Sequence, residues 1–288
     1  MLLNKGKVDV LKLRDMSSVF SRSAFLDVLQ YNDFTYFNWL YTRYHSRCST
    51  YESFIRRAYS MISKEYRCEY VYKNELIRSL LNKYGSEKTV YFSEFRIADS
   101  IADLAMFNGE CKVFEIKTEY DTPRRLDKQM NDYRKFFDRR YIVIPECKLN
   151  DYLGLTEETA GIILLKNTEN GIVLDEIREA SQNYEFDSKV MISCLQAREY
   201  EAIASALGAD VQSVLGYDRF RFCSDVFEAA SPKELKRLFL QEIKKRKNNT
   251  KYLCRYPLFL RQMMLSLNLS EAKADLLLKK LKITVLHS

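Results

Sequence analysis

Two acids and a lysine are the most informative feature of this 288-residue chain. Asp103, Glu115 and Lys117 lie in two apolar, strand-like runs that a short turn joins. Successive side chains of a strand point to opposite faces, so Glu115 and Lys117 share one face while Ile116 points into a core. On adjacent strands, both carboxylates and the ammonium group converge on one side. That arrangement suits a divalent metal and a phosphate better than it suits a core.

The chemistry of this group is electrostatic. Two carboxylates about 5 Å apart, at an effective dielectric near 20, repel by about 3 kcal/mol, and a bound cation removes that cost. Mg²⁺ prefers oxygen ligands, which Asp103, Glu115 and the carbonyl of Ile116 offer. Lys117 can orient a water or help to deprotonate it, and can stabilise charge that builds up on a phosphate. The competing interpretation is an exposed Glu115–Lys117 ion pair on an edge strand.

The composition argues against the main competing chemistries. The chain has two histidines, His45 and His287, and its seven cysteines include no C-x-x-C pair. These facts disfavour Ser-His-Asp triads, paired-histidine ribonuclease chemistry and structural zinc sites. The odd number of cysteines favours reduced thiols in a cytoplasm. Because no apolar run is long enough to cross a bilayer, we expect no membrane association.

The elements that must position these residues lie in the middle of the chain. Residues 1–70 read as an N-terminal helical region, 71–180 as the core, and 181–288 as a C-terminal helical, basic region. In the C-terminal region the pattern predicts helices over 190–207, 226–247 and 270–281. The core pattern predicts a helix, three strands, a helix, a strand and a hairpin, in the segments 75–84, 89–97, 101–107, 112–118, 124–137, 140–145 and 161–174. The predicted fold class is therefore α/β, with a mixed sheet flanked by helical regions.

Positive charge is concentrated near the end of the chain. The segment 233–261 contains ten Lys or Arg residues and two Glu, with aromatic residues between them. Such a segment either binds a polyanion or forms a solvated helix face. The candidate nucleic-acid contacts are Lys244, Lys245, Arg246 and Lys247.

The order of these residues resembles a known family. From about residue 73 to 145, the order is a helix with an acid, a strand, a strand with an aspartate, a strand with Glu-x-Lys, a helix and a buried strand. It resembles the PD-(D/E)XK nuclease superfamily, with its restriction-endonuclease-like fold. Gln129 and Tyr133 match the Gln-x-x-x-Tyr pattern of the RecB-like branch. The stretch 115–133 also resembles a small, poorly characterised bacterial family of that superfamily. Ala102 stands where the motif has a proline.

The resemblance assigns roles to individual residues. It implies that Asp103 and Glu115 bind Mg²⁺, with Mn²⁺ as a substitute, and that Lys117 positions the water or stabilises the transition state. It makes Glu75 an outer acid of the metal site and Gln129 a residue that orients the site or the scissile phosphate. For Tyr133 a packed aromatic is an equal alternative.

Further residues near the motif are candidates for weaker roles. Arg124, Arg125 and Lys128 lie in the first turns of the following helix, where they either grip phosphate or are solvated. Asp99 and Glu119 are nearby acids that can substitute in the metal site.

We therefore expect a Mg²⁺-dependent phosphodiesterase that hydrolyses nucleic acid, with DNA favoured. An RNA-cleaving toxin or defence effector is the first alternative. A non-catalytic module that binds nucleic acid or a protein partner is the second. Homo-oligomer formation and the choice of partner stay open.

Overall fold

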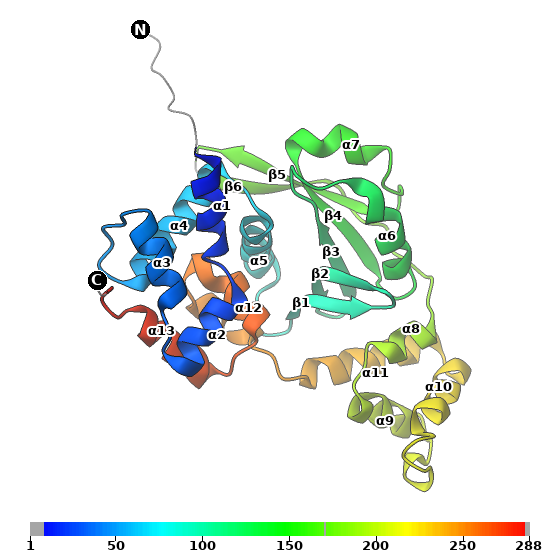
Figure 1. The fold of residues 1–288 in the computed structure, drawn as a ribbon. Helices are drawn as coiled ribbons and strands as arrows, with labels where there is room; N and C mark the ends of the chain where they lie inside the picture. Colours follow the sequence, from blue (N-terminus) through cyan, green and yellow to red (C-terminus); the bar gives the residue numbers. More distant parts are fainter. Residues whose placement is uncertain (1–8, 170, 286–288) are drawn as a thin grey trace.

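The computed structural model describes residues 9–169 and 171–285 (Figure 1). His287 lies outside these residues. One sheet of six strands runs in sequence order through the middle of the molecule. The strands are β1 (Val90–Ile97), β2 (Ser100–Phe107), β3 (Cys111–Ile116), β4 (Arg139–Pro145), β5 (Gly161–Thr168) and β6 (Gly171–Arg178). Strand β4 runs parallel to β3 and β5, whereas the remaining pairs are antiparallel. The predicted α/β class with a mixed sheet is confirmed.

Helices cover both faces of the sheet and enclose two hydrophobic cores. On one face lie α5 (Glu69–Tyr84) and the N-terminal helices, and on the other lie α6 (Leu126–Arg134) and most of the C-terminal helices. The N-terminal helices are α1 (Val10–Ser18), α2 (Arg22–Tyr31), α3 (Thr35–Arg43) and α4 (Tyr51–Glu65). The helices on the α6 side are α8 (Ser188–Ser193), α9 (Ala197–Ala206), α10 (Arg219–Ala229) and α11 (Pro232–Lys245).

The interior strands are mostly apolar because both of their faces are buried. In β2, Leu104 and Met106 face the α5 side, whereas Ala105 and Phe107 face the α6 side. Such runs are typical of interior strands, which β2 and β3 are. The predicted turn between these strands is present, and Gly109 adopts a φ of 118° that a side chain would strain.

Two long helices that the sequence pattern predicted are each interrupted. The predicted helix 190–207 is α8 and α9, because Gln196 and Glu199 form a capping box that starts a new helix. The predicted helix 226–247 is α10 and α11, because Pro232 occupies the first turn of α11 and its ring cannot continue a preceding helix. The short α7 (Leu149–Leu153) was not predicted.

The end of the chain returns to its beginning. Helices α12 (Arg261–Leu267) and α13 (Glu271–Leu281) lie beside the N-terminal helices in Figure 1 and share their hydrophobic core. The backbone N–H of Val285 donates to the carbonyl of Ser49 at 3.1 Å. Residues predicted as one C-terminal region therefore lie in two places, one on each side of the sheet.

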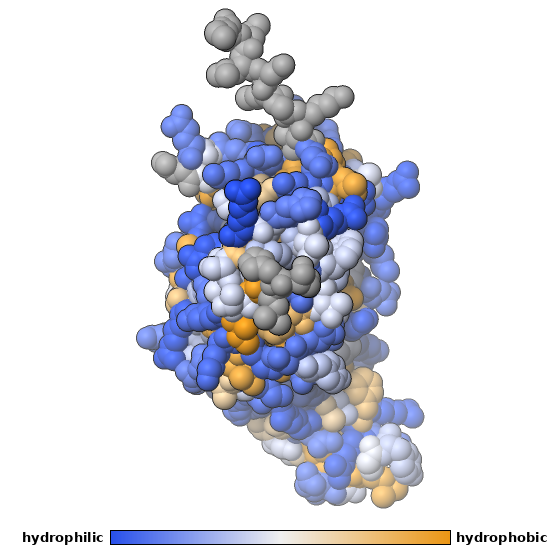
Figure 2. Space-filling model, turned by 60° about the vertical axis from the view of Figure 1, so that its left-hand side comes forward, coloured by the Kyte–Doolittle hydropathy of each residue, from blue (hydrophilic) through white to orange (hydrophobic). Residues whose placement is uncertain are grey.

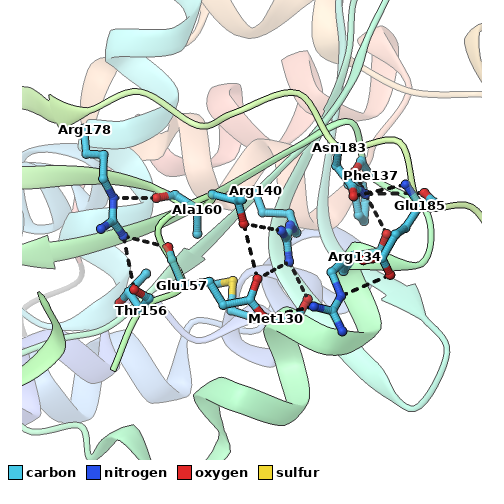
Figure 3. Close-up of polar contacts among 11 residues, drawn as sticks. Met130, Arg134, Phe137, Arg140, Thr156, Glu157, Ala160, Arg178, Asn183 and Glu185 are labelled. Carbon is cyan, nitrogen blue, oxygen red and sulfur yellow. Dashed lines mark hydrogen bonds and ion pairs between the residues drawn. The ribbon is translucent and has the colours of Figure 1, made fainter. Parts of the chain in front are cut away.

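A polar network fixes the end of α6 against the sheet (Figure 3). The buried guanidinium of Arg140, in β4, donates to the carbonyl of Met130 at 3.2 Å and to Glu157 at 3.2 Å. The amide of Asn183 donates to the carbonyls of Arg134 and Phe137, at 2.6 and 2.9 Å. Arg134 is the last residue of α6, where carbonyls have no helical partner, and Phe137 lies three residues beyond the helix. Helix α6 is thereby held in one orientation.

The surface in Figure 2 is mostly hydrophilic, and its hydrophobic side chains form small separate patches. Among the described residues, no helix is both long enough and apolar enough to cross a membrane.

Candidate active site

The two acids predicted to bind metal meet where β2 and β3 diverge. The last residues that pair across these strands are Leu104 and Phe114, so Asp103 and Glu115 are the next position in register. Beyond this point the carboxylate of Asp103 takes the place of a strand partner, and its Oδ2 accepts the backbone N–H of Ile116 at 2.8 Å. The sheet thus opens at the two carboxylates.

Glu115 in β3 and Lys117, the first residue after that strand, point to the same face, as the strand period predicts. Lys117 Nζ lies 2.7 Å from Glu115 Oε1, and their residues are 9% and 3% exposed. The side chain of Ile116 is buried in the core on the α5 side. Because β3 is an interior strand, the alternative of an exposed ion pair on an edge strand is wrong.

Helix α6 completes the arrangement from the other side. Gln129 accepts from Lys117 Nζ at 2.9 Å and donates to Glu115 Oε1 at 2.6 Å. One turn later, the Tyr133 hydroxyl donates to Glu115 Oε2 at 2.6 Å. Residues four apart lie on one face of a helix, so the Gln-x-x-x-Tyr spacing places both side chains on the same carboxylate. Tyr133 is therefore both a buried aromatic and a hydrogen-bond donor to the cluster.

Helix α5 supplies a second lysine that the sequence analysis missed. Lys73 Nζ lies 3.0 Å from Asp103 Oδ1 and 2.5 Å from a Glu69 carboxylate oxygen. Lys73 is 7% exposed. The signal in the sequence was the spacing of Glu69 and Lys73, which puts them on one helical face. We call Asp103, Glu115, Lys117, Gln129, Tyr133 and Lys73 the carboxylate–lysine cluster.

Glu75 does not join the cluster, and its predicted place facing the metal site is corrected. Its carboxylate accepts from the Tyr59 hydroxyl at 2.7 Å and from Arg78 at 2.6 Å. These residues line a separate cleft between α4, α5 and β6. The physical reason is that Glu75 lies about 200° around the helix from Lys73, which faces Asp103.

The other nearby acids also lie apart from the cluster. Asp99 is exposed and 3.7 Å from Lys128. Glu119 accepts the Tyr72 hydroxyl at 2.7 Å, and its other oxygen is buried without a hydrogen-bond partner among the described residues. Neither acid contacts Asp103 or Glu115 by a hydrogen bond or ion pair within the described ranges.

Burial changes the acid–base properties of the cluster. Burial raises the pKa of Glu115 above its ordinary value, and repulsion from the nearby Asp103 carboxylate adds to this rise. Burial alone would lower the pKa of Lys73, but the Asp103 and Glu69 carboxylates raise it above its ordinary value. The negative charges of Asp103 and Glu115 are therefore stabilised by the ammonium groups of Lys73 and Lys117.

The donor chemistry of the cluster fits a magnesium ion better than a transition metal. Among the described residues, no three His, Cys, Asp or Glu side chains lie close enough together to hold a metal. Mg²⁺ is bound through one or two carboxylates, several waters and the phosphates of a substrate. Asp103 and Glu115 supply two such carboxylates. A metal ion would have to displace an ammonium group from the oxygen that it binds, because Lys73 contacts Asp103 and Lys117 contacts Glu115.

Three of the predicted basic contacts lie at the start of α6, the helix that carries Gln129. Arg124 and Arg125 are exposed in a short 3₁₀ turn (Pro123–Arg125) that precedes α6, and Lys128 is exposed in its first turn. Gln129 follows directly. The structure therefore leaves the side chains of these cations in solvent, next to a helix that reaches the cluster.

In the second basic group, at the end of α11, two residues pair with acids and two are exposed. Arg246 donates to both Glu199 oxygens, at 2.9 and 2.5 Å, so its prediction as a nucleic-acid contact is corrected: the guanidinium is already occupied. Lys245 pairs with Glu242, whereas Lys244 and Lys247 are exposed.

Helix α11 is anchored away from the cluster. Lys236, on the same helix, contacts Asp138 at 2.6 Å, just before β4 begins. In the parallel pair of β3 and β4, that is the end opposite to Lys117.

Comparison with known proteins matches most of the chain to one protein family. A family model described as bacteriophage P4 protein cII matches residues 62–272, which include the whole sheet and the cluster. No curated protein matches the chain. The solved structure of SPO1766, a protein of unknown function from Silicibacter pomeroyi, is 14% identical and has a TM-score of 0.33. That match covers 51% of this chain and 94% of the other.

Proposed function

The chain belongs to the bacteriophage P4 protein cII family, and we propose that it is a metal-dependent nuclease. The observation that carries the proposal is the network in which Lys117 and Gln129 both contact Glu115 while Asp103 lies at the adjacent register position. Two carboxylates, a lysine and an amide at one opening of a sheet suit phosphodiester hydrolysis. No histidine contributes to these contacts.

The order of elements also supports the proposal. From α5 to β4 the chain forms a helix, three antiparallel strands, a helix and a strand parallel to β3. This is the order that the resemblance to the PD-(D/E)XK superfamily implies. Asp103 and Glu115 would hold the cation, and the carbonyl of Ile116 is a candidate third oxygen.

Each residue of the cluster has a role that follows from its contacts. When bound, a divalent cation supplies Lewis-acid charge and lowers the pKa of a bound water. Lys117 has three N–H donors and uses two on Glu115 and Gln129, so a third remains for a water or a phosphate oxygen. Gln129 holds the Lys117 ammonium and the Glu115 carboxylate at fixed positions, and Tyr133 orients the other oxygen of Glu115.

The substrate is proposed to be DNA, with RNA as the alternative. Arg124 and Arg125 precede Gln129 by five and four residues and are exposed, which suits contacts with the phosphates that flank the scissile bond. All seven cysteines are free, which supports a reducing compartment such as the cytoplasm.

A cleavage assay tests the proposed function. Purified protein is incubated with labelled single-stranded DNA, double-stranded DNA and RNA, in Mg²⁺, in Mn²⁺ or in EDTA. We expect cleavage with either metal, none in EDTA, and a loss of at least about 100-fold in Asp103→Asn and Lys117→Met. Lys112→Met is the matched control, because Lys112 lies in β3 and is 8% exposed, but pairs with Glu110.

The outcomes separate the three functions under consideration. Cleavage that survives in Asp103→Asn and Lys117→Met contradicts the assignment of these residues. Preference for RNA supports the RNA-cleaving alternative. Binding of nucleic acid without cleavage in any metal supports a non-catalytic module.

A further inference from the structure

The carboxylate that opens the sheet already has a cationic partner. Asp103 Oδ2 accepts the backbone N–H of Ile116, and its other oxygen, Oδ1, lies 3.0 Å from Lys73 Nζ. The backbone N–H of Ile116 is fixed by the strand, whereas the side chain of Lys73 can rotate away from Asp103. Oδ1 is therefore the oxygen that a metal would approach, and the Lys73 ammonium lies on it.

An ammonium and a divalent cation compete for that oxygen. Both are positive, and at the separation of neighbouring ligands they repel strongly in a site that excludes water. Lys117 faces a weaker conflict, because it contacts only Oε1 of Glu115, whereas Oε2 accepts from the neutral Tyr133 hydroxyl and leaves the metal an oxygen without an ammonium on it. Of the two lysines, Lys73 is the one that metal binding must displace.

Lys73 has an alternative partner within reach. Glu69 lies one helical turn before it and contacts the same ammonium at 2.5 Å. The Glu69 side chain is 59% exposed, whereas that of Asp103 is 17% exposed. A small rotation of the lysine therefore moves its charge from a buried acid to one at the surface without leaving it unpaired.

We propose that Lys73 is an internal counter-ion, which neutralises Asp103 while the site is free of metal and withdraws to Glu69 when a divalent cation binds. This inference rests on the proposed function, because it assumes that Asp103 is a metal ligand. It adds a residue that opposes metal binding and stabilises the metal-free fold. Removing Lys73 should therefore raise the affinity for metal and lower the stability of the metal-free protein.

Calorimetric titration of the full-length protein with Mn²⁺ tests the inference. We expect Lys73→Met to bind Mn²⁺ at least about tenfold more tightly than the unmodified protein, the change that 1.4 kcal/mol produces. In EDTA the same variant unfolds at a lower temperature, because Asp103 and Glu115 are left with one ammonium between them, and Mn²⁺ reverses this loss. Lys112→Met, an equally buried lysine away from the cluster, leaves Mn²⁺ affinity unchanged.

Two further variants separate the causes. In Glu69→Gln/Lys73→Met, a retained gain in affinity shows that the removed charge is responsible, whereas a lost gain shows that Glu69 became a ligand and overturns the inference. Lys73→Gln replaces Lys73→Met if the latter does not fold, because the amide still donates to Asp103 without a charge.

The result also distinguishes this inference from the proposed function. Equal Mn²⁺ affinity of the unmodified protein and Lys73→Met overturns the role of Lys73 and leaves the metal site intact. Absence of Mn²⁺ binding in the unmodified protein and in every variant overturns both.

Discussion

At the scale of single residues, the carboxylate of Glu115 depends on its donors. It is buried at 3% exposure, and Lys117, Gln129 and Tyr133 together supply three hydrogen bonds to its two oxygens. If a buried carboxylate loses a donor, the folded state is destabilised by most of the free energy of desolvation. The contribution of each donor can therefore be measured as stability before any activity is known.

Tyr133→Phe tests this dependence. The ring stays in its core while the hydroxyl that donates to Glu115 at 2.6 Å is removed. Hydrogen bonds to charged groups contribute about 2 kcal/mol, so we expect the free energy of unfolding to fall by about that amount. Denaturant titration in EDTA measures it. Tyr152→Phe is the control: Tyr152 is also fully buried, but its hydroxyl lies 3.4 Å from the Asp121 carbonyl, and an equal loss there would contradict the account.

At the scale of elements, a buried ion pair joins α9 to the end of α11. Glu199 is 3% exposed and receives both Arg246 contacts and the backbone N–H of Gln196. Burial raises the pKa of Glu199, but the Arg246 hydrogen bond and the Gln196 N–H outweigh it, so the pKa lies below its ordinary value. The pair therefore fixes the corner between the two helices most firmly when Glu199 is ionised.

Glu199→Gln tests the role of this pair through its pH dependence. Breaking a buried pair costs about 3 kcal/mol, so we expect a loss of that size near neutral pH. Because the folded protein lowers the pKa of Glu199, its contribution is fully present above the ordinary value of 4.5 and is lost as the pH falls through the folded value. The stability gap between the two proteins should narrow below pH 4.5.

Urea unfolding of both proteins across this pH range measures the gap. Glu242→Gln is a control from the same helix, because its partner Lys245 is largely exposed and such pairs contribute less than about 1 kcal/mol. A gap for Glu199→Gln that stays constant down to the lowest pH would contradict the argument.

At the scale of the whole molecule, positive charge lies in two places with different relations to the cluster. Arg124 and Arg125 precede the helix that carries Gln129, whereas Lys244 and Lys247 lie at the end of a helix anchored beside Asp138. If the protein binds nucleic acid at Lys117 as proposed, we expect the first group to contact it and the second not to. Its salt dependence should therefore depend on the arginines.

Charge removal on each group tests this expectation. Each phosphate contact contributes about 0.7–0.9 to the slope of log affinity against log salt, so Arg124→Gln/Arg125→Gln should lower the slope by about 1.4–1.8. Fluorescence anisotropy with a labelled oligonucleotide measures it, in a Lys117→Met background that prevents cleavage. Lys244→Gln/Lys247→Gln should leave the slope unchanged, and the reverse pattern would move the binding surface to α11.

Local patterns predicted much of the fold and of the cluster. The strand period placed Glu115 and Lys117 on one face, and the four-residue helical spacing placed Gln129 and Tyr133 together. Both patterns act within one element, where geometry follows directly from the sequence.

Contacts between distant elements were harder to predict. Lys73 contacts Asp103, 30 positions later in the sequence. Glu75 faces away from the cluster, because packing sets the rotation of α5 about its axis and the sequence pattern does not show that rotation. The charge run 233–261 likewise gave no sign that Arg246 is held by Glu199. Packing between helices decides these contacts, and no local pattern encodes it.

We propose that Asp103 and Glu115 together bind a divalent metal ion. Anomalous diffraction from crystals soaked in Mn²⁺ tests it most directly, because the signal marks the metal itself. We predict a peak within coordination distance of Asp103 Oδ1 and a Glu115 oxygen, with the Lys73 ammonium moved toward Glu69. A saturating soak that leaves no peak there, with Lys73 still on Asp103, would contradict the claim.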